Sequence, residues 1–174
     1  ATGTAMTAAN KATATGTGAL ASGTSAKAQG THATALGFSA QATANQATAV
    51  GREAAATGSY ATALGNLAKA GGGSALALGD RSSATHTNAV ALGAGSVTNS
   101  ANSVSVGNAT TKRKIQYVAD GTVGSGSTDA VTGSQLHATN TNVSAAQSAA
   151  TTAQTAATAA QRTADGVVSR ATAL

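Results

Sequence analysis

The sequence predicts a parallel β-solenoid built from 14-residue turns, followed by an α-helical coiled coil. Two periodic patterns lead to this fold class. Glycine recurs every 14 residues from Gly23 to Gly107, which indicates a structural repeat. Beyond Leu136 glycine becomes rare, and small apolar residues recur in heptads instead. We therefore expect two structurally distinct parts in one chain.

Each 14-residue repeat is expected to hold two short strands joined by tight bends. Small residues alternate with other residues on both sides of the glycine, and a period of two is typical of strands. The positions two and four before the glycine, and three and five after it, are nearly always small up to a last turn at residues 101–114. Successive turns would pair in parallel about 4.8 Å apart. We expect two sheets that approach closely across an alanine interior.

A stripe of larger apolar residues is expected on the outside of this roll. The residue directly before the glycine is leucine or valine in most repeats, and it cannot fit inside an alanine-lined interior. An exposed apolar stripe demands a partner, and a second copy of the chain is the simplest one. The predicted interface residues in this part are Leu36, Val50, Leu64, Leu78, Val90, Leu92, Val104 and Val106.

The composition excludes several classes of protein. The 174 residues include no cysteine, so disulfides, thiol catalysis and thiolate metal sites are absent. No apolar run approaches the ~20 residues of a membrane helix, and we expect targeting and anchoring segments to lie outside this sequence. The net charge is +5, but the basic residues are scattered and lack the interleaved aromatic residues of single-strand binders. We expect no nucleic-acid partner and no cofactor.

The C-terminal heptads predict a coiled-coil stalk at residues 137–174. From Val143 onward, both positions of the heptad seam are apolar over more than four heptads. Gly166 and the many threonines would make an isolated helix poor, so partner helices are expected. Such a helix would span about 57 Å. The predicted interface residues in and next to this part are Leu136, Val143, Ala150, Ala157 and Ala164.

A connecting segment joins the two parts. Gly121, Gly124 and Gly126 have a spacing that suggests a phosphate-binding loop, but no lysine follows and no βαβ unit surrounds them. We expect a flexible connector instead. Asp129 precedes the helical pattern and is expected to cap the start of a helix.

The order of these parts resembles the YadA-like trimeric autotransporter adhesins. The matching stretches are residues 88–93 with Ser96, residues 102–107, residues 112–119 with Gly121, residues 128–131 and residues 135–136. The resemblance implies a left-handed parallel β-roll head at residues 1–111, a neck at 112–136 and a trimeric coiled-coil stalk at 137–174. The alanine- and threonine-rich style is similar to that of Burkholderia members, although most turns carry threonine where the family usually has valine.

The resemblance also implies a homotrimer on the bacterial cell surface, with an outer-membrane anchor outside this sequence. The family's heads bind host extracellular matrix proteins or cell-surface molecules. Three wide rolls must converge on three narrow helices at the neck. As a hypothesis, Arg113 and Lys114 form ion pairs there with Asp120 or Asp129 of neighbouring chains.

Adhesion to host matrix or epithelial cells is the function that the sequence favours. A spacer that holds another binding domain away from the cell is the alternative. An ice-binding solenoid is a further one, suggested by the threonine column Thr34, Thr48 and Thr62. The acids and histidines lie at no catalytic or metal-binding spacing, so no enzyme is expected. The predicted ligand surface consists of Phe38, Arg52, Tyr60, Lys69 and Arg81.

Overall fold

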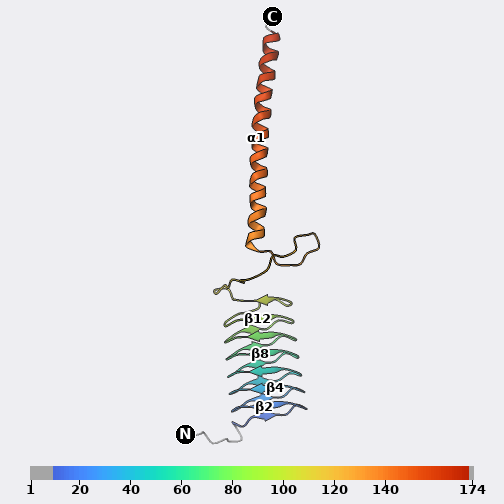
Figure 1. The fold of residues 1–174 in the computed structure, drawn as a ribbon. Coiled ribbons are helices and arrows are strands. Elements are labelled where there is room, and N and C mark those ends of the chain that lie inside the picture. The colour runs from blue at the N-terminus through green and yellow to red at the C-terminus, as the bar shows by residue number, and fades with distance from the viewer. Residues whose placement is uncertain (1–9, 173–174) are drawn as a thin grey trace. The chain divides into compact units, whose positions relative to one another are not determined.

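The structure is a computed structural model that describes residues 10–172. The chain divides into two compact units, Ala1–Lys114 and Ile115–Leu174. The first unit is a roll of short parallel strands, and the second contains one long helix (Figure 1). The predicted fold class, a parallel β-solenoid followed by a helical stalk, is confirmed.

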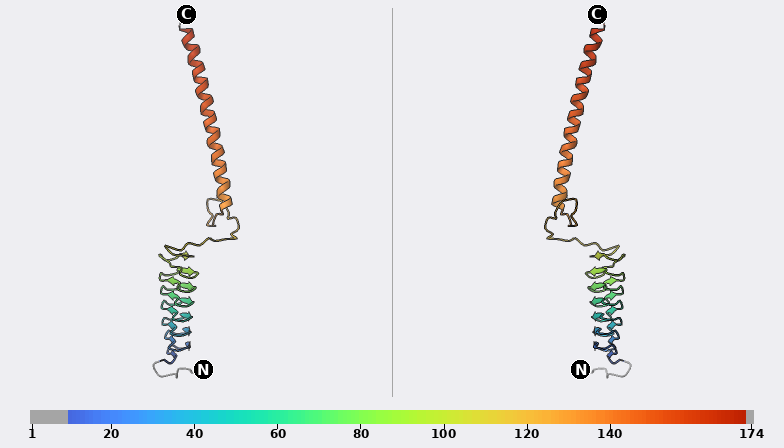
Figure 2. Two further views of the ribbon diagram at one scale, coloured as in Figure 1. Left: turned by 90° about the vertical axis from the view of Figure 1, so that its left-hand side faces the viewer. Right: turned by 90° about the vertical axis from the view of Figure 1, so that its right-hand side faces the viewer.

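The first unit is a β-roll made of two parallel sheets whose turns stack on one another (Figure 2). The six-stranded sheet has the order β1-β3-β5-β7-β9-β11, and the seven-stranded sheet has the order β13-β12-β10-β8-β6-β4-β2. The strands of the first sheet are β1 (Thr13–Ala14), β3 (Lys27–Ala28), β5 (Gln41–Ala42), β7 (Ala55–Ala56), β9 (Lys69–Ala70) and β11 (Ser83–Ala84). Those of the second are β2 (Leu20–Ser22), β4 (Thr34–Leu36), β6 (Thr48–Val50), β8 (Thr62–Leu64), β10 (Leu76–Leu78), β12 (Val90–Leu92) and β13 (Val104–Ser105).

Alanine fills the space between the two sheets. The central residue of most strands in the seven-stranded sheet and the second residue of most strands in the six-stranded sheet are alanines with no exposed surface, such as Ala35 and Ala42. Each pairs in register with the alanine one turn away, as Ala35 does with Ala49. The bulkiest fully buried side chains among the described residues are Ser82 and Ser96. The expected thin interior is therefore confirmed.

The repeated glycine occupies a bend that no other residue can enter without strain. Gly37, Gly51, Gly65 and Gly79 have φ between +128° and +138°, a region that L side chains rarely adopt. A Cβ on Gly51 would also lie 2.6 Å from the carbonyl carbon of Gly65, one turn further along. Backbone conformation and close stacking both require glycine here, and this accounts for the 14-residue period.

A second bend feature recurs every seven residues. At most of these bends the left-handed residue is not glycine and has φ between 51° and 62°, whereas Gly18 and Gly95 fill the equivalent position at two others. The left-handed conformation of a residue other than glycine costs roughly 1–2 kcal/mol of conformational free energy. Its N–H, however, donates a hydrogen bond to a carbonyl of the preceding turn. Ser39 N–H, for example, donates to the Thr24 carbonyl at 2.8 Å. These residues are Ser25, His32, Ser39, Gln46, Glu53, Tyr60, Leu67, Ser74, Arg81, Asn88 and Asn102.

The expectation of two strands in every turn is wrong for the last two. After β12 the six-stranded sheet continues only as an isolated bridge between Ser83 and Val97. β13 pairs with β12, but no strand of the six-stranded sheet follows it, and Thr110 and Lys112 are exposed instead of interior. The side-chain carbonyl of Asn108 accepts hydrogen bonds from the N–H groups of Thr110 and Thr111, at 2.9 and 2.8 Å. These bonds hold a local turn in place of the second strand.

The second unit contains the helix α1 (Gly133–Ala171). The helix begins with a capping box, in which Thr132 is the N-cap and Gln135 reaches back to the Thr132 backbone. The expectation that Asp129 caps the helix is therefore wrong, because the cap lies three residues later. At 1.5 Å per residue the helix is about 58 Å long, and none of its described residues is buried.

Replacement of Gly65 by alanine tests the glycine requirement. We expect Gly65→Ala to lower the free energy of unfolding of the roll by about 2 kcal/mol or more per chain, because alanine is strained at this φ and meets the next turn. Gly71→Ala is the matched control, since its Cβ would meet only ordinary contacts at 3.7 Å or beyond. Guanidinium unfolding followed by circular dichroism would measure both, and equal effects would contradict the explanation.

Candidate functional site

The outer face of the seven-stranded sheet carries the predicted apolar stripe. In each three-residue strand from β4 to β12 the central alanine points inward, so the first and third residues point outward. The third residues stack in register, Leu36 on Val50, Val50 on Leu64, and so on. This column contains Leu36, Val50, Leu64, Leu78 and Leu92, and the first residues contribute Thr34, Thr48, Thr62, Leu76, Val90 and Val104.

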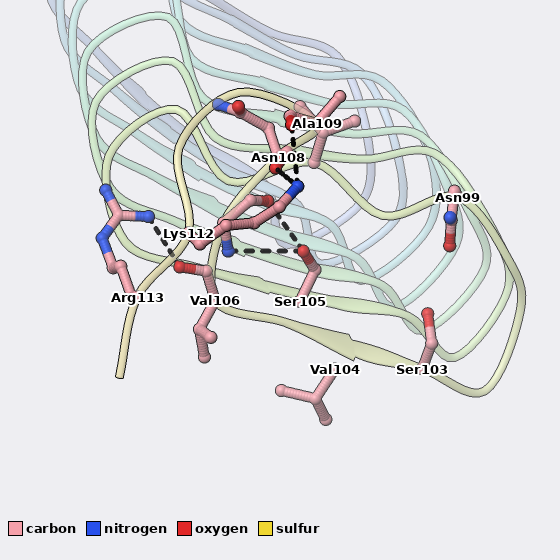
Figure 3. Close-up of a pocket in the computed structure, with 11 residues that line it drawn as sticks. Asn99, Ser103, Val104, Ser105, Val106, Asn108, Ala109, Lys112 and Arg113 are labelled. Carbon is pink, nitrogen blue, oxygen red and sulfur yellow. Dashed lines mark hydrogen bonds between the residues drawn. The ribbon is translucent and has the colours of Figure 1, made fainter. Parts of the chain in front are cut away.

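This apolar sheet face has no cover in the single chain. Leu64 is 42% exposed, Leu92 43% and Val104 70%. Val104 and Val106 project from the last turn of the roll, and Ser105 lies between them (Figure 3). Burial of one leucine or valine side chain is worth about 1.5–3 kcal/mol. Covering the whole face would therefore be a large stabilising term for a roll whose own interior is alanine.

The outer face of the six-stranded sheet has the opposite character. Its outward residues include Lys27, Gln41 and Lys69, all exposed. Thr43, Thr57 and Thr85, which directly follow strands of this sheet, are polar as well, and Thr57 and Thr85 are exposed. The two outer faces of the roll thus differ in polarity, and only the seven-stranded face has the apolar character of a contact surface.

The five residues of the predicted ligand surface do not form one patch. Phe38, Arg52 and Arg81 lie on the bends that follow the seven-stranded sheet, beside the repeated glycine. Tyr60 lies on the opposite bends, which follow the six-stranded sheet, and Lys69 is on the face of that sheet. The structure brings Phe38, Arg52 and Arg81 to the same edge of the roll and leaves the other two elsewhere.

Arg113 closes the C-terminal end of the roll. Its guanidinium donates to the carbonyl of Val106 at 2.7 Å (Figure 3). It also donates to the carbonyl of Ala94 at 2.6 Å and to the hydroxyl of the buried Ser96 at 3.0 Å. The adjacent Lys112 donates from Nζ to the carbonyls of Asn108 and Ala109. These two side chains donate hydrogen bonds to carbonyls that no further turn of the roll can reach. The position of Arg113 among other basic residues in the sequence did not indicate this role.

The acidic residues of the neck hold the segment before α1. Asp120 accepts a hydrogen bond from the Thr132 hydroxyl at 2.6 Å, and Asp129 accepts one from the Thr122 N–H at 2.9 Å. The bonds from Thr122 lower the pKa of Asp129 below its ordinary value of 3.8. A depressed pKa means that the contact is present at neutral pH and is lost only when the pH falls through this lowered value. Ion pairs of these acids with neighbouring chains stay a prediction.

Large apolar side chains of the neck are exposed in the single chain. Ile115 is 71% exposed, Tyr117 103% and Val131 64%. Ile115, Tyr117, Val118 and Val131 line an open groove before α1, and a second groove runs from Val123 to Leu136. Of the large apolar residues in these two grooves, only Leu136 is among the predicted interface residues; Ile115, Tyr117, Val118, Val123 and Val131 are not. Their size in a chain of small residues is the signal that points to them.

The stalk residues predicted to form the seam lie on α1. Val143, Ala150, Ala157 and Ala164 are seven residues apart within one continuous helix and are all exposed. Many threonines and serines of the helix donate to the carbonyl four residues earlier, as Thr151 does to Gln147. This pattern slightly destabilises a helix, so we expect contacts with partner helices to stabilise α1.

No group of histidine and acidic side chains among the described residues could hold a metal ion. Within residues 10–172, no helix is both long and apolar enough to cross a membrane. The site that the geometry defines is a contact surface: an apolar sheet face, an exposed neck and an alanine seam. These are features of a fibrous protein that assembles from several chains.

Comparisons with known proteins identify the family. The model of the YadA head domain repeat matches six overlapping stretches: residues 14–40, 28–54, 42–68, 56–82, 70–96 and 84–110. The model of the coiled stalk of trimeric autotransporter adhesin matches residues 114–159. The chain belongs to the YadA-like trimeric autotransporter adhesins. Both families are adhesins and not enzymes, and they imply a surface-exposed passenger region of an outer-membrane protein.

A solved structure is also similar, the collagen-binding domain of the Yersinia adhesin YadA. The sequence identity is 30%, and the match covers 68% of this chain and 73% of that chain, with a TM-score of 0.55. No curated protein sequence matches the chain. The structural match supports the β-roll assignment independently of the repeat models.

Replacement of Arg113 tests its role at the end of the roll. We expect Arg113→Met to lower the free energy of unfolding by about 1–2 kcal/mol per chain, because it removes three charge-assisted hydrogen bonds from an exposed side chain. Lys27→Met, which replaces an exposed lysine on β3, is the control and should change the free energy by less than about 0.5 kcal/mol. Chemical unfolding followed by far-ultraviolet circular dichroism measures both, and an equal loss in the two variants would argue against the end-cap role.

A threonine pair tests which outer face is a contact surface. Thr62 points from β8 onto the apolar sheet face, and Thr57 is exposed just after β7 on the other sheet. We expect Thr62→Asp to lower the melting temperature of the assembly by several degrees, since it places buried like charges in contact. Thr57→Asp should leave it unchanged. Thermal melts combined with sedimentation would decide, and the reverse order of effects would exclude this interface.

Proposed function

We propose that this chain is a segment of a homotrimeric bacterial adhesin that attaches to host cells or extracellular matrix through its β-roll. In this proposal residues 1–111 are the head, 112–136 the neck and 137–174 the first part of the stalk. The chain is displayed on the cell surface by an outer-membrane anchor outside this sequence. The observation that carries the proposal is the in-register apolar face on one sheet only.

In the proposed trimer this apolar sheet face lies between the chains. The proposed head contacts are Leu36, Val50, Leu64, Leu78, Val90, Leu92, Val104 and Val106, continued by Leu136, Val143, Ala150, Ala157 and Ala164 in the helix. Arg113 and Lys114 are proposed to face Asp120 or Asp129 of neighbouring chains, in addition to the contacts that Arg113 makes within the roll.

Attachment through a repetitive surface suits this architecture. A long fibre needs no deep pocket, because three heads present the same weak contacts side by side and raise the effective concentration of each. The solved YadA domain is described as collagen-binding. We extend to this chain the general capacity to bind matrix or cell surfaces, with the polar sheet and the bends as the faces left free.

Two alternatives make different predictions. A spacer would show the same trimer without attachment. An ice-binding solenoid would need its threonine column in water, whereas Thr34, Thr48 and Thr62 share the apolar sheet face with the leucine column. That shared face favours an interface over an ice-binding surface.

The proposal is tested with the purified full chain. Analytical ultracentrifugation should give three times the mass of the 16.3 kDa chain. The trimer should then bind immobilised matrix proteins or cultured epithelial cells in a saturable manner. A monomer would contradict the architecture, and a trimer that attaches to none of these surfaces would favour the spacer.

A further inference from the structure

Four side chains form a ridge along one edge of the roll. Phe38, Arg52, Asn66 and Asp80 each follow the repeated glycine, so they occupy the same bend position on four successive turns. Their carbonyls accept the N–H of the left-handed residue one turn further, as Phe38 does from Glu53 at 2.8 Å. This ladder fixes their spacing at about 4.8 Å per turn. We call this set the bend ridge.

Hydrogen bonds between turns hold the side chains of the bend ridge in place. Arg52 donates to the Asn66 side-chain carbonyl at 3.3 Å, and Asn66 donates to Asp80 at 2.6 Å. The flanking residues complete the network, with Arg52 paired to Glu53 and Arg81 paired to Asp80, both at 2.7 Å. The two arginines and two acids cancel in charge, so the ridge is polar, ordered and neutral.

One end of the bend ridge carries an exposed aromatic ring. Phe38 is 51% exposed and is the single phenylalanine of a chain whose aromatic content is 2%. The arginine side chains are 57% and 67% exposed, so their guanidinium groups keep donors for a ligand. Phe38 therefore offers an accessible aromatic ring at one end of a preorganised polar network.

We propose that the bend ridge binds a neutral glycan. An aromatic ring stacks against the apolar face of a sugar, and guanidinium, amide and carboxylate groups bond pairs of neighbouring sugar hydroxyls. A sugar ring is about as long as one turn of the roll is high, so successive sugars can contact successive turns. The inference rests on the proposed attachment function and names the class of ligand for it.

The charge pattern favours a neutral glycan over an anionic one. A polyanion is recognised by uncompensated cations, but Arg52 and Arg81 are each paired with an acid. The lysines of the six-stranded sheet, Lys27 and Lys69, lie on another face. The ridge itself contains charged side chains and lies at the edge of the apolar sheet face. The proposal requires that association through that face leave the ridge in solvent. A trimer then presents three ridges.

A glycan array with the full-length trimer tests the proposal. The probes are neutral hexose and N-acetylhexosamine oligosaccharides of two to four units, with sialylated and sulfated glycans as comparators. We expect binding to neutral probes, and a loss of about tenfold in affinity by titration calorimetry for Phe38→Ala and for Asn66→Ala. Phe38→Tyr keeps the ring and should bind within about twofold of the parent.

Tyr60→Ala is the matched control, because Tyr60 is the other exposed aromatic residue of the roll and lies on the opposite bends. Its glycan affinity should be unchanged. The proposal is overturned if no neutral glycan binds, if Phe38→Ala binds like the parent, or if only anionic glycans bind. It is overturned as well if Phe38→Ala lowers the melting temperature of a trimer that binds no glycan, since the ring would then be covered by a neighbouring copy.

Parallel attachment assays separate this inference from the proposed function. If cells or matrix proteins bind the parent and Phe38→Ala equally, the glycan site is contradicted and the attachment function remains supported. Glycan binding without attachment to any cell or matrix would support the glycan site and contradict the proposed attachment function.

Discussion

The close stacking of successive backbone turns is the constraint on which the roll depends. Each turn bonds to the next through strand ladders and through the left-handed residue at each bend. The stacking leaves no room for a side chain at the repeated glycine, where a Cβ would meet the next glycine carbonyl. The same stacking aligns equivalent residues in columns, so a feature that appears once in a repeat becomes a line along the fibre.

Because the interior of the roll is thin, the large apolar side chains whose burial could stabilise it lie on its outside. Alanine buries little area, and the interior of the described roll contains no larger side chain than serine or threonine. Backbone hydrogen bonds hold the shape, and the leucine and valine side chains that could add hydrophobic stabilisation lie on one outer face. We therefore expect folding of the roll and association of chains to be coupled, because the leucine and valine side chains available for burial lie on this outer face.

The ends of the roll need their own solution, because a solenoid leaves an open layer of carbonyls after its last turn. Here Asn108 turns the chain and Arg113 and Lys112 donate to the carbonyls that remain.

The helix has few means of selecting its partners by itself. Its described charged residues are Arg162, Asp165 and Arg170, and Gln147, Gln154 and Gln161 occupy flanking heptad positions where ionic pairs often set partner choice.

The sequence alone determined the two-part fold, the alanine interior and the outward leucine column, because a repeat with a period of two leaves each side chain only two directions. It also predicted the continuous helix. Only the tertiary structure decided the rest. The left-handed bends are filled by many residue types, so no sequence pattern marks them. The end-cap role of Arg113 and the true N-cap Thr132 depend on hydrogen bonds between residues that no periodicity relates. The last two turns keep the repeat spacing but lack the second strand. The division of the ligand residues among three surfaces follows from the position of each within its own turn.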